Sequence, residues 1–380
     1  MSPTPVTFTS PGQPASYSWE ATDEEVAARY GLPVESIVRF DLNTSPAPPG
    51  LVSRLLAEGR FESPLSEYPP SDYRRLVAAA AAAYGVAAEE ILVGAGADEI
   101  LDLIGKAFIP SGGEALIPTP SYAMYRVITE QRGARVVAVP RRPASQGWAI
   151  DIDGVRAAAR TAQVVWLCNP NNPTGLAEPP GAVESLLAGI AEDALAAGLE
   201  APIVALDEAY AEFVGKSLVD ARLAHPNLIL IRTASKAYAL AGLRVGFAIA
   251  QPETIARLAP YRPPGSVSTV SVTLVTEALL EPTAMRANVA RVDAERERLA
   301  SALAGVGWSV GPSVTNFLLV RFDSPAAASR AAETLLNRGL VPRTFPTGHP
   351  LADSLRLTVR DRLENERLVA AAAEAAERGR

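Results

Sequence analysis

The chain has 380 residues, of which 48% are hydrophobic, and carries a formal net charge of −7 at pH 7. This length predicts two domains, and the acidic balance argues against a nucleic-acid-binding surface, which needs basic residues to neutralise phosphates. One Cys and two His exclude a disulfide framework and leave too few ligands for a Cys/His zinc site, so we expect no metal.

The N-terminal stretch, residues 1–20, is rich in proline and predicts a flexible arm before a short helix over Asp23–Tyr30. Its lack of basic residues does not fit a signal peptide. No run of the sequence is apolar for the length that a membrane-spanning helix needs. We therefore expect a cytoplasmic protein that makes no contact with a membrane.

From about residue 72, helical patterns alternate with short apolar runs, and helices are predicted over Ser71–Tyr84 and Asp98–Phe108. Most runs are rich in Leu or β-branched residues with little polar alternation, as expected of strands covered on both faces. The runs are Ile91–Val93, Ala115–Ile117, Arg135–Val139, Val164–Cys168, Ile203–Leu206, Leu228–Ile231 and Val245–Ile249. This alternation predicts an α/β fold whose large domain holds a mostly parallel seven-stranded sheet between helices.

After Pro260 the pattern changes, with a proline-rich segment to Gly265 followed by a long, charged helical stretch. The later elements predicted are Val314–Phe322, a helix near Ala326–Asn337, Leu355–Val359 and a terminal helix from about Leu363. These elements predict a smaller α+β domain. We divide the chain into an N-terminal arm with part of the small domain (1–44), the large ligand-binding domain (45–262) and the C-terminal small domain (263–380).

Parallel strands end at one edge of an open sheet, where such sheets bind ligands. After the first run, the turn Gly94-Ala95-Gly96-Ala97-Asp98-Glu99 opens a helix and offers N–H groups and a positive dipole end to a phosphate. It lacks the third glycine of the dinucleotide fingerprint. After Val164–Cys168, two Asn-Pro steps between Asn169 and Gly175 force a defined loop, whose Asn amides can donate hydrogen bonds to a ligand oxygen.

Two further strand ends carry titratable side chains. Asp207 follows Ile203–Leu206, and a buried carboxylate there needs a cationic or hydrogen-bonded partner, such as a protonated ring nitrogen. Tyr210 could turn its phenol toward the same ligand. Of the three lysines in the chain, only Lys236 follows a predicted strand, and a partly desolvated amine has a lowered pKa and forms Schiff bases readily. Nearby Ser235 and Arg244 suit a phosphate.

Together these positions describe a ligand with a phosphate, a ring nitrogen, a ring oxygen and an aldehyde. Pyridoxal 5′-phosphate (PLP) has all four groups.

The sequence resembles the PLP-dependent aminotransferases of fold type I, class I and II, and within them is most similar to the histidinol-phosphate aminotransferase branch. The motifs that carry this resemblance are Tyr68-Pro69, Val93–Glu99, Pro120–Tyr125, Asn169–Gly175, Asp207–Tyr210, Arg232–Lys236, Leu240–Gly246, Thr315–Phe317 and Leu355–Thr358.

The resemblance implies that Lys236 forms a Schiff base with PLP and then carries protons as general acid and base. Asp207 would keep the pyridine nitrogen protonated, Asn172 and Tyr210 would bond the ring 3′ oxygen, and Tyr122 would stack on the ring. The phosphate would be held by Gly96, Ala97, Asp98, Thr233, Ser235 and Arg244.

For the substrate, the resemblance implies that Arg356 binds the α-carboxylate or an equivalent anion and Arg343 the distal anion, with Asn316 and Asn43 supporting the site. Tyr68 would reach the cofactor phosphate of the other subunit, which implies a homodimer with shared active sites. The implied reaction moves an amino group from a donor, expected to be glutamate, to a small 2-oxo acceptor. Histidinol phosphate and imidazole acetol phosphate are the leading pair.

The sequence departs from the branch in four places: Asn43-Thr44-Ser45-Pro46 lacks an acidic residue, Pro70 replaces Asp, Pro260–Gly265 has extra prolines, and Arg360 replaces Gly. The first and third lie near the expected side-chain pocket. Aromatic amino acids and their oxo acids are the next candidate substrates. A threonine-phosphate decarboxylase would share most motifs. A nucleotide-binding oxidoreductase or a regulatory protein using the Gly94–Glu99 turn would leave the other motifs unexplained.

Overall fold

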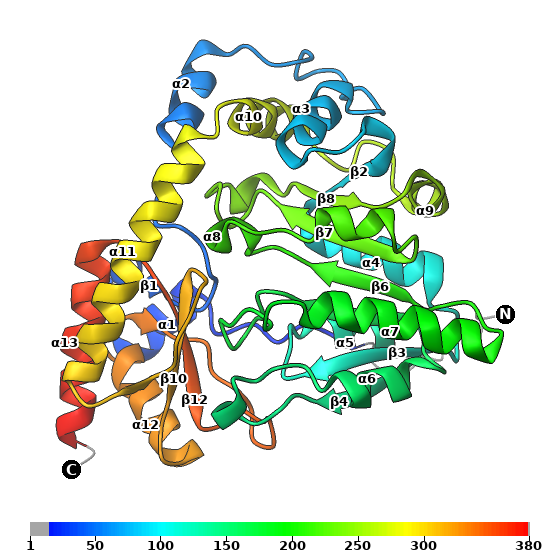
Figure 1. Ribbon diagram of the computed structural model, residues 1–380. Coiled ribbons are helices and arrows are strands. Elements are labelled where there is room, and N and C mark those ends of the chain that lie inside the picture. Colours follow the sequence, from blue (N-terminus) through cyan, green and yellow to red (C-terminus); the bar gives the residue numbers. More distant parts are fainter. Residues whose placement is uncertain (1–14, 379–380) are drawn as a thin grey trace, which may run out of the picture.

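A computed structural model describes residues 15–378, so most of the predicted arm, residues 1–14, lies outside the described residues. The large domain is built on a seven-stranded sheet in the order β2-β8-β7-β6-β5-β3-β4 (Figure 1). The strands are β2 (Ile91–Gly94), β3 (Glu114–Thr119), β4 (Arg135–Pro140), β5 (Val164–Cys168), β6 (Ile203–Asp207), β7 (Leu228–Thr233) and β8 (Gly246–Ile249). All neighbours pair in parallel except β8, which is antiparallel to β2 and β7, so the predicted mostly parallel sheet is confirmed.

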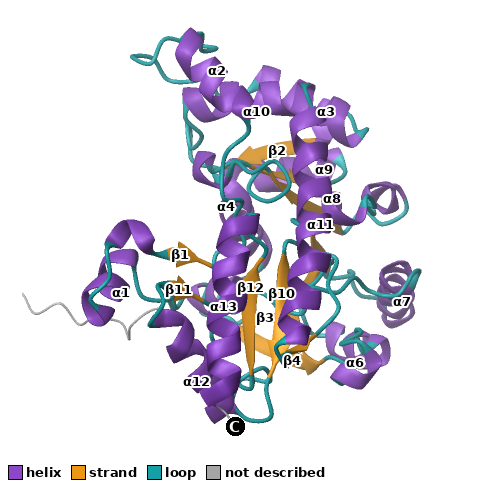
Figure 2. Cartoon of the chain, turned by 90° about the vertical axis from the view of Figure 1, so that its left-hand side faces the viewer, coloured by secondary structure: helices purple, strands orange, loops and turns teal. Residues whose placement is uncertain are grey.

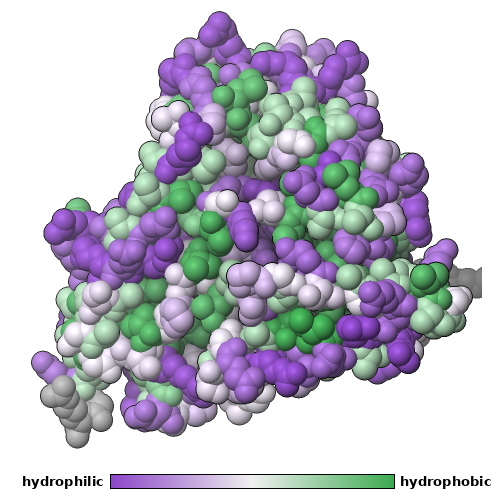
Figure 3. Space-filling model, in the orientation of Figure 1, coloured by the Kyte–Doolittle hydropathy of each residue, from purple (hydrophilic) through white to green (hydrophobic). Residues whose placement is uncertain are grey.

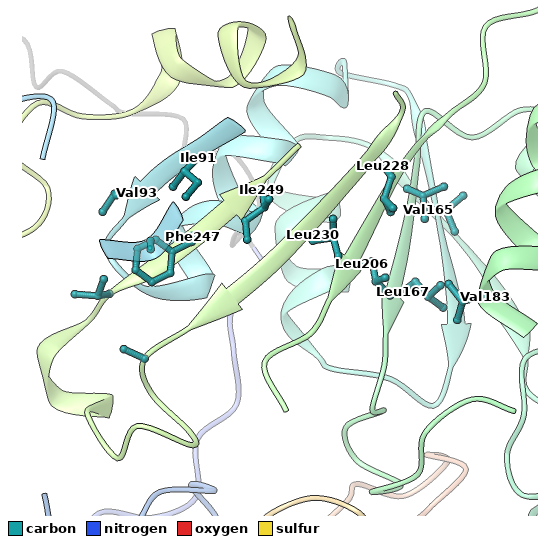
Figure 4. Close-up of a cluster of buried hydrophobic side chains, with 14 of the residues drawn as sticks. Ile91, Val93, Val165, Leu167, Val183, Leu206, Leu228, Leu230, Phe247 and Ile249 are labelled. Atoms are coloured by element: carbon teal, nitrogen blue, oxygen red, sulfur yellow. The ribbon is translucent and has the colours of Figure 1, made fainter. Parts of the chain in front are cut away.

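Helices cover both faces of this sheet, which explains why its strands are apolar throughout. One face is covered by α3 (Arg74–Tyr84), α6 (Ile152–Ala159), α7 (Ala182–Ala197) and α10 (Thr269–Leu280). The other face is covered by α4 (Gly96–Phe108), α5 (Met124–Gln131) and α9 (Pro252–Leu258). Each face of the sheet and its helices enclose one hydrophobic core, called the first and the second core in the order given. In β7, Leu228 and Leu230 belong to the first core, and Ile229 and Ile231 belong to the second. Figure 4 shows the first core, where side chains from neighbouring strands lie side by side.

The small domain packs helices on short strands (Figure 2). A three-stranded antiparallel sheet is formed by β9 (Ser309–Val310), β10 (Phe317–Arg321) and β12 (Ser354–Thr358), and β1 (Val38–Arg39) pairs in parallel with β11 (Leu340–Val341). Its helices are α1 (Asp23–Tyr30), α11 (Thr283–Gly305), α12 (Pro325–Leu336) and α13 (Arg362–Arg378). The two remaining α-helices of the described chain are α2 (Gly50–Glu58) and α8 (Ala211–Val214). The predicted α+β character is confirmed.

The long helical stretch predicted after Gly265 is two helices, because α10 ends before Pro282 and α11 begins after it. Val272 and Val275 of α10 belong to the core of the large sheet, so this helix packs with the large domain although it follows residue 262. In Figure 1, α11 runs from beside α10 to the small domain. Helix α10 therefore shares the core of the large sheet, and the boundaries at residues 44 and 262 remain predictions.

None of the helices that the structure describes is long and apolar enough to cross a membrane. The face seen in Figure 3 mixes hydrophilic and hydrophobic side chains, and its strongly hydrophobic patches are small and separated.

The sheet topology decides where functional side chains meet. β2, β5, β6 and β7 run in one direction and end at the same edge, whereas β8 runs in the opposite direction and begins there. Residues that follow four strands and residues that precede a fifth are therefore brought together.

Candidate active site

A cavity of about 560 Å³, called here the inner cavity, opens at this edge of the sheet. The strand ends contribute Ala97, Asp98, Cys168, Asn172, Asp207, Tyr210, Thr233, Ser235, Lys236 and Arg244. Arg356 of the small domain, the segment Asp41–Thr44, and Tyr17 and Trp19 complete much of the wall. Residues that are far apart in the sequence thus line one space, as predicted from the strand ends.

Lys236 lies in the inner cavity without an ion-pair partner among the residues described. Its Nζ lies 3.4 Å from the carbonyl oxygen of Leu42 and 3.3 Å from that of Asn43, and 5.9 Å from the centre of the Tyr210 ring. Burial, followed by the positive charge of Arg356, lowers the pKa of the Lys236 amine to about 8. At pH 7 about a tenth of the amine is therefore neutral and nucleophilic, far more than for an ordinary lysine.

Asp207 is the last residue of β6 and only 4% exposed. Its two oxygens accept hydrogen bonds from the Tyr125 hydroxyl at 2.8 Å and from the Ala209 N–H at 3.0 Å. Within residues 15–378 no Arg or Lys lies within ion-pair distance of it. Burial raises the pKa of the Asp207 carboxyl to about 6, against the lowering effect of the Tyr125 hydrogen bond. This site would therefore be stabilised by a cation that binds in the cavity.

The start of α4 forms the end of the inner cavity that is suited to a phosphate. Gly96 has a φ of 85°, and a Cβ there would lie 2.5 Å from a terminal nitrogen of Arg244. A Cβ on Gly246 would lie 2.4 Å from the Gly96 backbone. Glycine is thus required at both positions, and the close packing leaves the N–H groups of Ala97 and Asp98 at a helix N-terminus, where they have no acceptor within the helix.

Hydroxyl groups and one arginine surround the same end. Thr233 donates to the Ser235 hydroxyl oxygen at 2.9 Å and both residues are buried. Arg244 donates to Asp98 at 3.1 Å, and Asp98 also accepts from the Tyr122 hydroxyl at 3.1 Å. The predicted phosphate-binding residues therefore lie together, although Arg244 is paired with a carboxylate.

A buried network of amides and a phenol joins the inner cavity to the small domain. Asn43 donates from Nδ2 to the Tyr210 hydroxyl at 3.0 Å, and its own carbonyl accepts from Asn316 Nδ2 at 2.9 Å. Asn172 accepts from Arg356 at 2.6 Å. Burial raises the pKa of Tyr210, so it remains a protonated phenol. These contacts fix Asn172, Tyr210 and the predicted supporting residues around one space.

A second cavity of about 610 Å³, called here the outer cavity, adjoins the first and shares Arg356, Tyr17, Tyr122 and Asn172 with it. Arg356 is 6% exposed, and its Nε is buried without a partner in the described part of the chain. Its other contacts are the Asp41 carbonyl and the Phe317 ring. Arg356 is therefore placed to bind an anion between the two cavities.

Arg343 lies in the outer cavity, where it holds the segment before α1. It donates to the Ser18 carbonyl at 2.7 Å, lies 3.7 Å from a Glu20 oxygen and stacks 5.2 Å from the centre of the Tyr17 ring. Glu20 also accepts hydrogen bonds from the backbone and hydroxyl of Thr344, each at 2.8 Å. The predicted role of Arg343 toward a distal anion remains a prediction, and any such anion would meet Arg343 beside Glu20.

Tyr68 is not among the residues that line either cavity, and it is 91% exposed. Its predicted role concerns the other subunit and remains a prediction.

The sequence did not single out several residues of the site. Tyr125, which is buried behind Asp207, lies in the quoted Pro120–Tyr125 motif, whose second tyrosine was a usable signal. Tyr17, Phe345 and His349 come from irregular segments and carried no such signal.

Comparison with known proteins assigns this arrangement to a family. The family described as Aminotransferase class I and II matches residues 55–371. The chain belongs to this family. Among curated aminotransferases, it is 37% identical over 91% of its length to histidinol-phosphate aminotransferase of Roseiflexus castenholzii, of which 91% is covered. It is 38% identical over 80% of its length to the protein of the same name from Xylella fastidiosa strain 9a5c, of which 83% is covered.

A solved aminotransferase has the same overall structure. Histidinol-phosphate aminotransferase from Sinorhizobium meliloti, in complex with pyridoxal-5′-phosphate, superimposes with a TM-score of 0.84 at 25% identity, with 96% of each chain covered. The predicted fold type I architecture is thereby confirmed.

Proposed function

We propose that the chain binds PLP and transfers an amino group from glutamate to imidazole acetol phosphate, the reverse direction converting histidinol phosphate. The observation that carries this proposal is that Lys236 and Asp207, both lacking ion-pair partners in the described structure, line one cavity with a helix N-terminus at its end. The comparisons support the same reaction class and, through the names of the relatives, the same substrate.

The residues present fit PLP. Asp207 is buried with neutral hydrogen-bond donors only, and a protonated ring nitrogen would supply the missing cation. Gly96 and Gly246 keep the start of α4 clear of side chains, which suits a phosphate. When bound, PLP supplies an aldehyde that takes up the amino group and a ring that withdraws electrons from the substrate carbon.

The chain's own residues then have distinct tasks. Asp207 holds positive charge at the ring nitrogen, and Asn172 and Tyr210 orient the ring oxygen. Lys236 Nζ, with its lowered pKa, takes a proton from the substrate carbon or returns one. Arg356 orients the substrate through its anionic group, which decides which bond on the reacting carbon is aligned with the ring.

A phosphate-bearing substrate is supported by the charges of the outer cavity. Among the residues described, Arg126, Arg343 and Arg356 line this cavity against one lining carboxylate, Glu20, and Arg126 also pairs with Glu130 outside it. A phosphate ester is therefore favoured over a neutral aromatic side chain.

The decisive experiment mixes the purified protein with histidinol phosphate and 2-oxoglutarate and measures glutamate. We expect glutamate formation, a visible absorption band from the bound cofactor, and loss of both in Lys236→Ala. A Lys216→Ala control, at a lysine outside both cavities, should keep both signals. Full transamination by Lys236→Ala would refute the proposal. Release of CO₂ from O-phosphothreonine without a 2-oxo acid would identify a decarboxylase instead.

We further propose a homodimer with shared active sites, supported by the exposure of Tyr68. Dimers mixed from two variants test this proposal. Tyr68→Ala and Lys236→Ala homodimers should each be deficient in activity. Their heterodimer has one complete site, because Lys236 of the first variant meets Tyr68 of the second. Random mixing should restore about a quarter of the wild-type activity. No recovery in verified heterodimers would refute shared sites.

We also propose the cytoplasm as the location, since the proposed substrates are intermediates of amino-acid biosynthesis.

A further inference from the structure

His349 is a wall residue of the outer cavity that the proposed reaction does not yet use. It lies in the loop between β11 and β12 and lines the cavity together with Arg343 and Phe345. The other histidine, His225, lies near the start of β7, at the opposite edge of the sheet. His349 is thus the one histidine beside the proposed substrate.

The hydrogen bonding of His349 fixes which ring nitrogen carries the proton. Its Nδ1 lies 3.1 Å from the backbone nitrogen of Leu351, and because an amide N–H only donates, Nδ1 must accept. In the neutral ring the proton is then on Nε2. Burial, followed by the charge of Arg343, lowers the pKa of His349, so the ring is neutral at pH 7. His349 therefore presents an Nε2–H donor.

That donor has no acceptor among residues 15–378, and it is not one of the buried atoms that lack a partner. It must therefore be accessible. Nδ1 is taken by the backbone N–H of buried Leu351. Since His349 lines the outer cavity, its Nε2–H is the donor of this ring that remains available to a ligand there.

The ring is also held in place. It stacks on Phe345 with centroids 4.9 Å apart and planes inclined by 17°. The backbone of His349 donates to the Pro346 carbonyl at 3.0 Å and accepts from Ala352 N–H at 2.9 Å. A stacked ring on a hydrogen-bonded turn loses little entropy when it binds a ligand.

We propose that His349 is a specificity-determining residue whose Nε2–H donates a hydrogen bond to the phosphate of the substrate, beside Arg343. This inference rests on the proposed function, and it names the group of the substrate that the loop between β11 and β12 recognises. A neutral donor adds direction to the charge of the nearby arginine, since a phosphate oxygen must lie on the line of the N–H bond.

Two substitutions separate this role from a structural one. His349→Asn keeps an oxygen near the Nδ1 position that can accept from Leu351 but removes the Nε2–H donor. His349→Gln places an amide N–H near the Nε2 position but loses the contact to Leu351. His225→Asn is the matched control, the same replacement at the histidine outside the cavity.

The assay measures kcat and KM of the PLP-loaded dimer with histidinol phosphate, with histidinol and with glutamate. We expect His349→Asn to lower kcat/KM for histidinol phosphate by about 10- to 100-fold, mainly through KM, the range for a hydrogen bond to a charged group. Histidinol and glutamate should change by less than about threefold, His349→Gln should recover most of the loss, and His225→Asn should behave as the wild type.

Three results would overturn the inference. The first is an unchanged kcat/KM of His349→Asn for histidinol phosphate, and the second is an equal loss of kcat/KM for histidinol, which indicates a structural role. The third is a loss of kcat/KM for glutamate alone, which indicates that His349 binds a carboxylate. If the unaltered chain fails to use histidinol phosphate, the proposed function fails instead.

Discussion

Replacing Asp207 by Asn separates two effects of its buried carboxylate. One is the loss of stability of the cofactor-free protein, and the other is the contribution to turnover when PLP is bound. Burial raises the pKa of Asp207 from 3.8 to about 6. This difference corresponds to about 3 kcal/mol, at about 1.4 kcal/mol per pH unit. Because the folded pKa is the higher one, the ionised carboxylate destabilises the cofactor-free fold above about pH 6, and the effect disappears as the pH falls toward 4.

Asp207→Asn should therefore stabilise the cofactor-free protein at neutral pH by about 1–3 kcal/mol. Asn is close to Asp in shape, and the Tyr125 hydroxyl can rotate to accept from the new amide. With PLP bound, the same change should lower kcat by about 10²- to 10⁴-fold, since breaking a buried ion pair costs about 3–5 kcal/mol.

Urea unfolding of the PLP-free protein, followed by tryptophan fluorescence near pH 8 and near pH 4, measures the first effect. The stability gap between variant and wild type should shrink at the lower pH. The control is Asp193→Asn, which breaks a partly exposed pair with Arg156 and should leave turnover unchanged. A less stable Asp207→Asn near pH 8, or one with full turnover, would refute the reasoning.

Three further outcomes are expected. Gly246→Ala should weaken PLP binding by at least about tenfold, because its Cβ would lie 2.4 Å from the backbone at the start of α4. Gly242→Ala, whose Cβ would have nothing within 4 Å, should leave binding unchanged. Titration of the absorption band with PLP measures both variants. Arg356→Lys should raise the KM for glutamate by about 10- to 100-fold without changing that band, because lysine cannot reproduce the fork of donors. Tyr125→Phe should raise the pKa of Asp207 in the cofactor-free protein, because the hydrogen bond that it removes lowers that pKa; the pH dependence of urea unfolding measures the change.

The chemistry of the inner cavity could be predicted because it depends on strand ends. Asp207 and Lys236 are polar residues directly after apolar runs, and parallel strands bring such positions to one edge. Tyr125 could not be linked to Asp207 in this way, because it lies 82 positions earlier in α5 and meets the carboxylate only through packing.

Element ends were less predictable where polar residues continue a strand. β7 extends through Arg232 and Thr233, since both still pair with β8. Arg232 is tolerated there because Glu212, at 2.7 Å, neutralises it. Part of the wall of the outer cavity was missed for a different reason: Phe345 and His349 lie in an irregular loop that has no hydrophobic period.

The segment from Ser16 to Glu20 has a consequence for how selectivity can change over evolution. It forms part of the wall of the outer cavity but lies outside residues 55–371, the part of the chain that matches the family. Substitutions or length changes in this segment can reshape the space around the substrate while Lys236 and Asp207 keep their surroundings in the sheet. Selectivity for a different amino-acceptor substrate can thus evolve through changes in this N-terminal segment. The strands on which folding and cofactor chemistry both depend need not change.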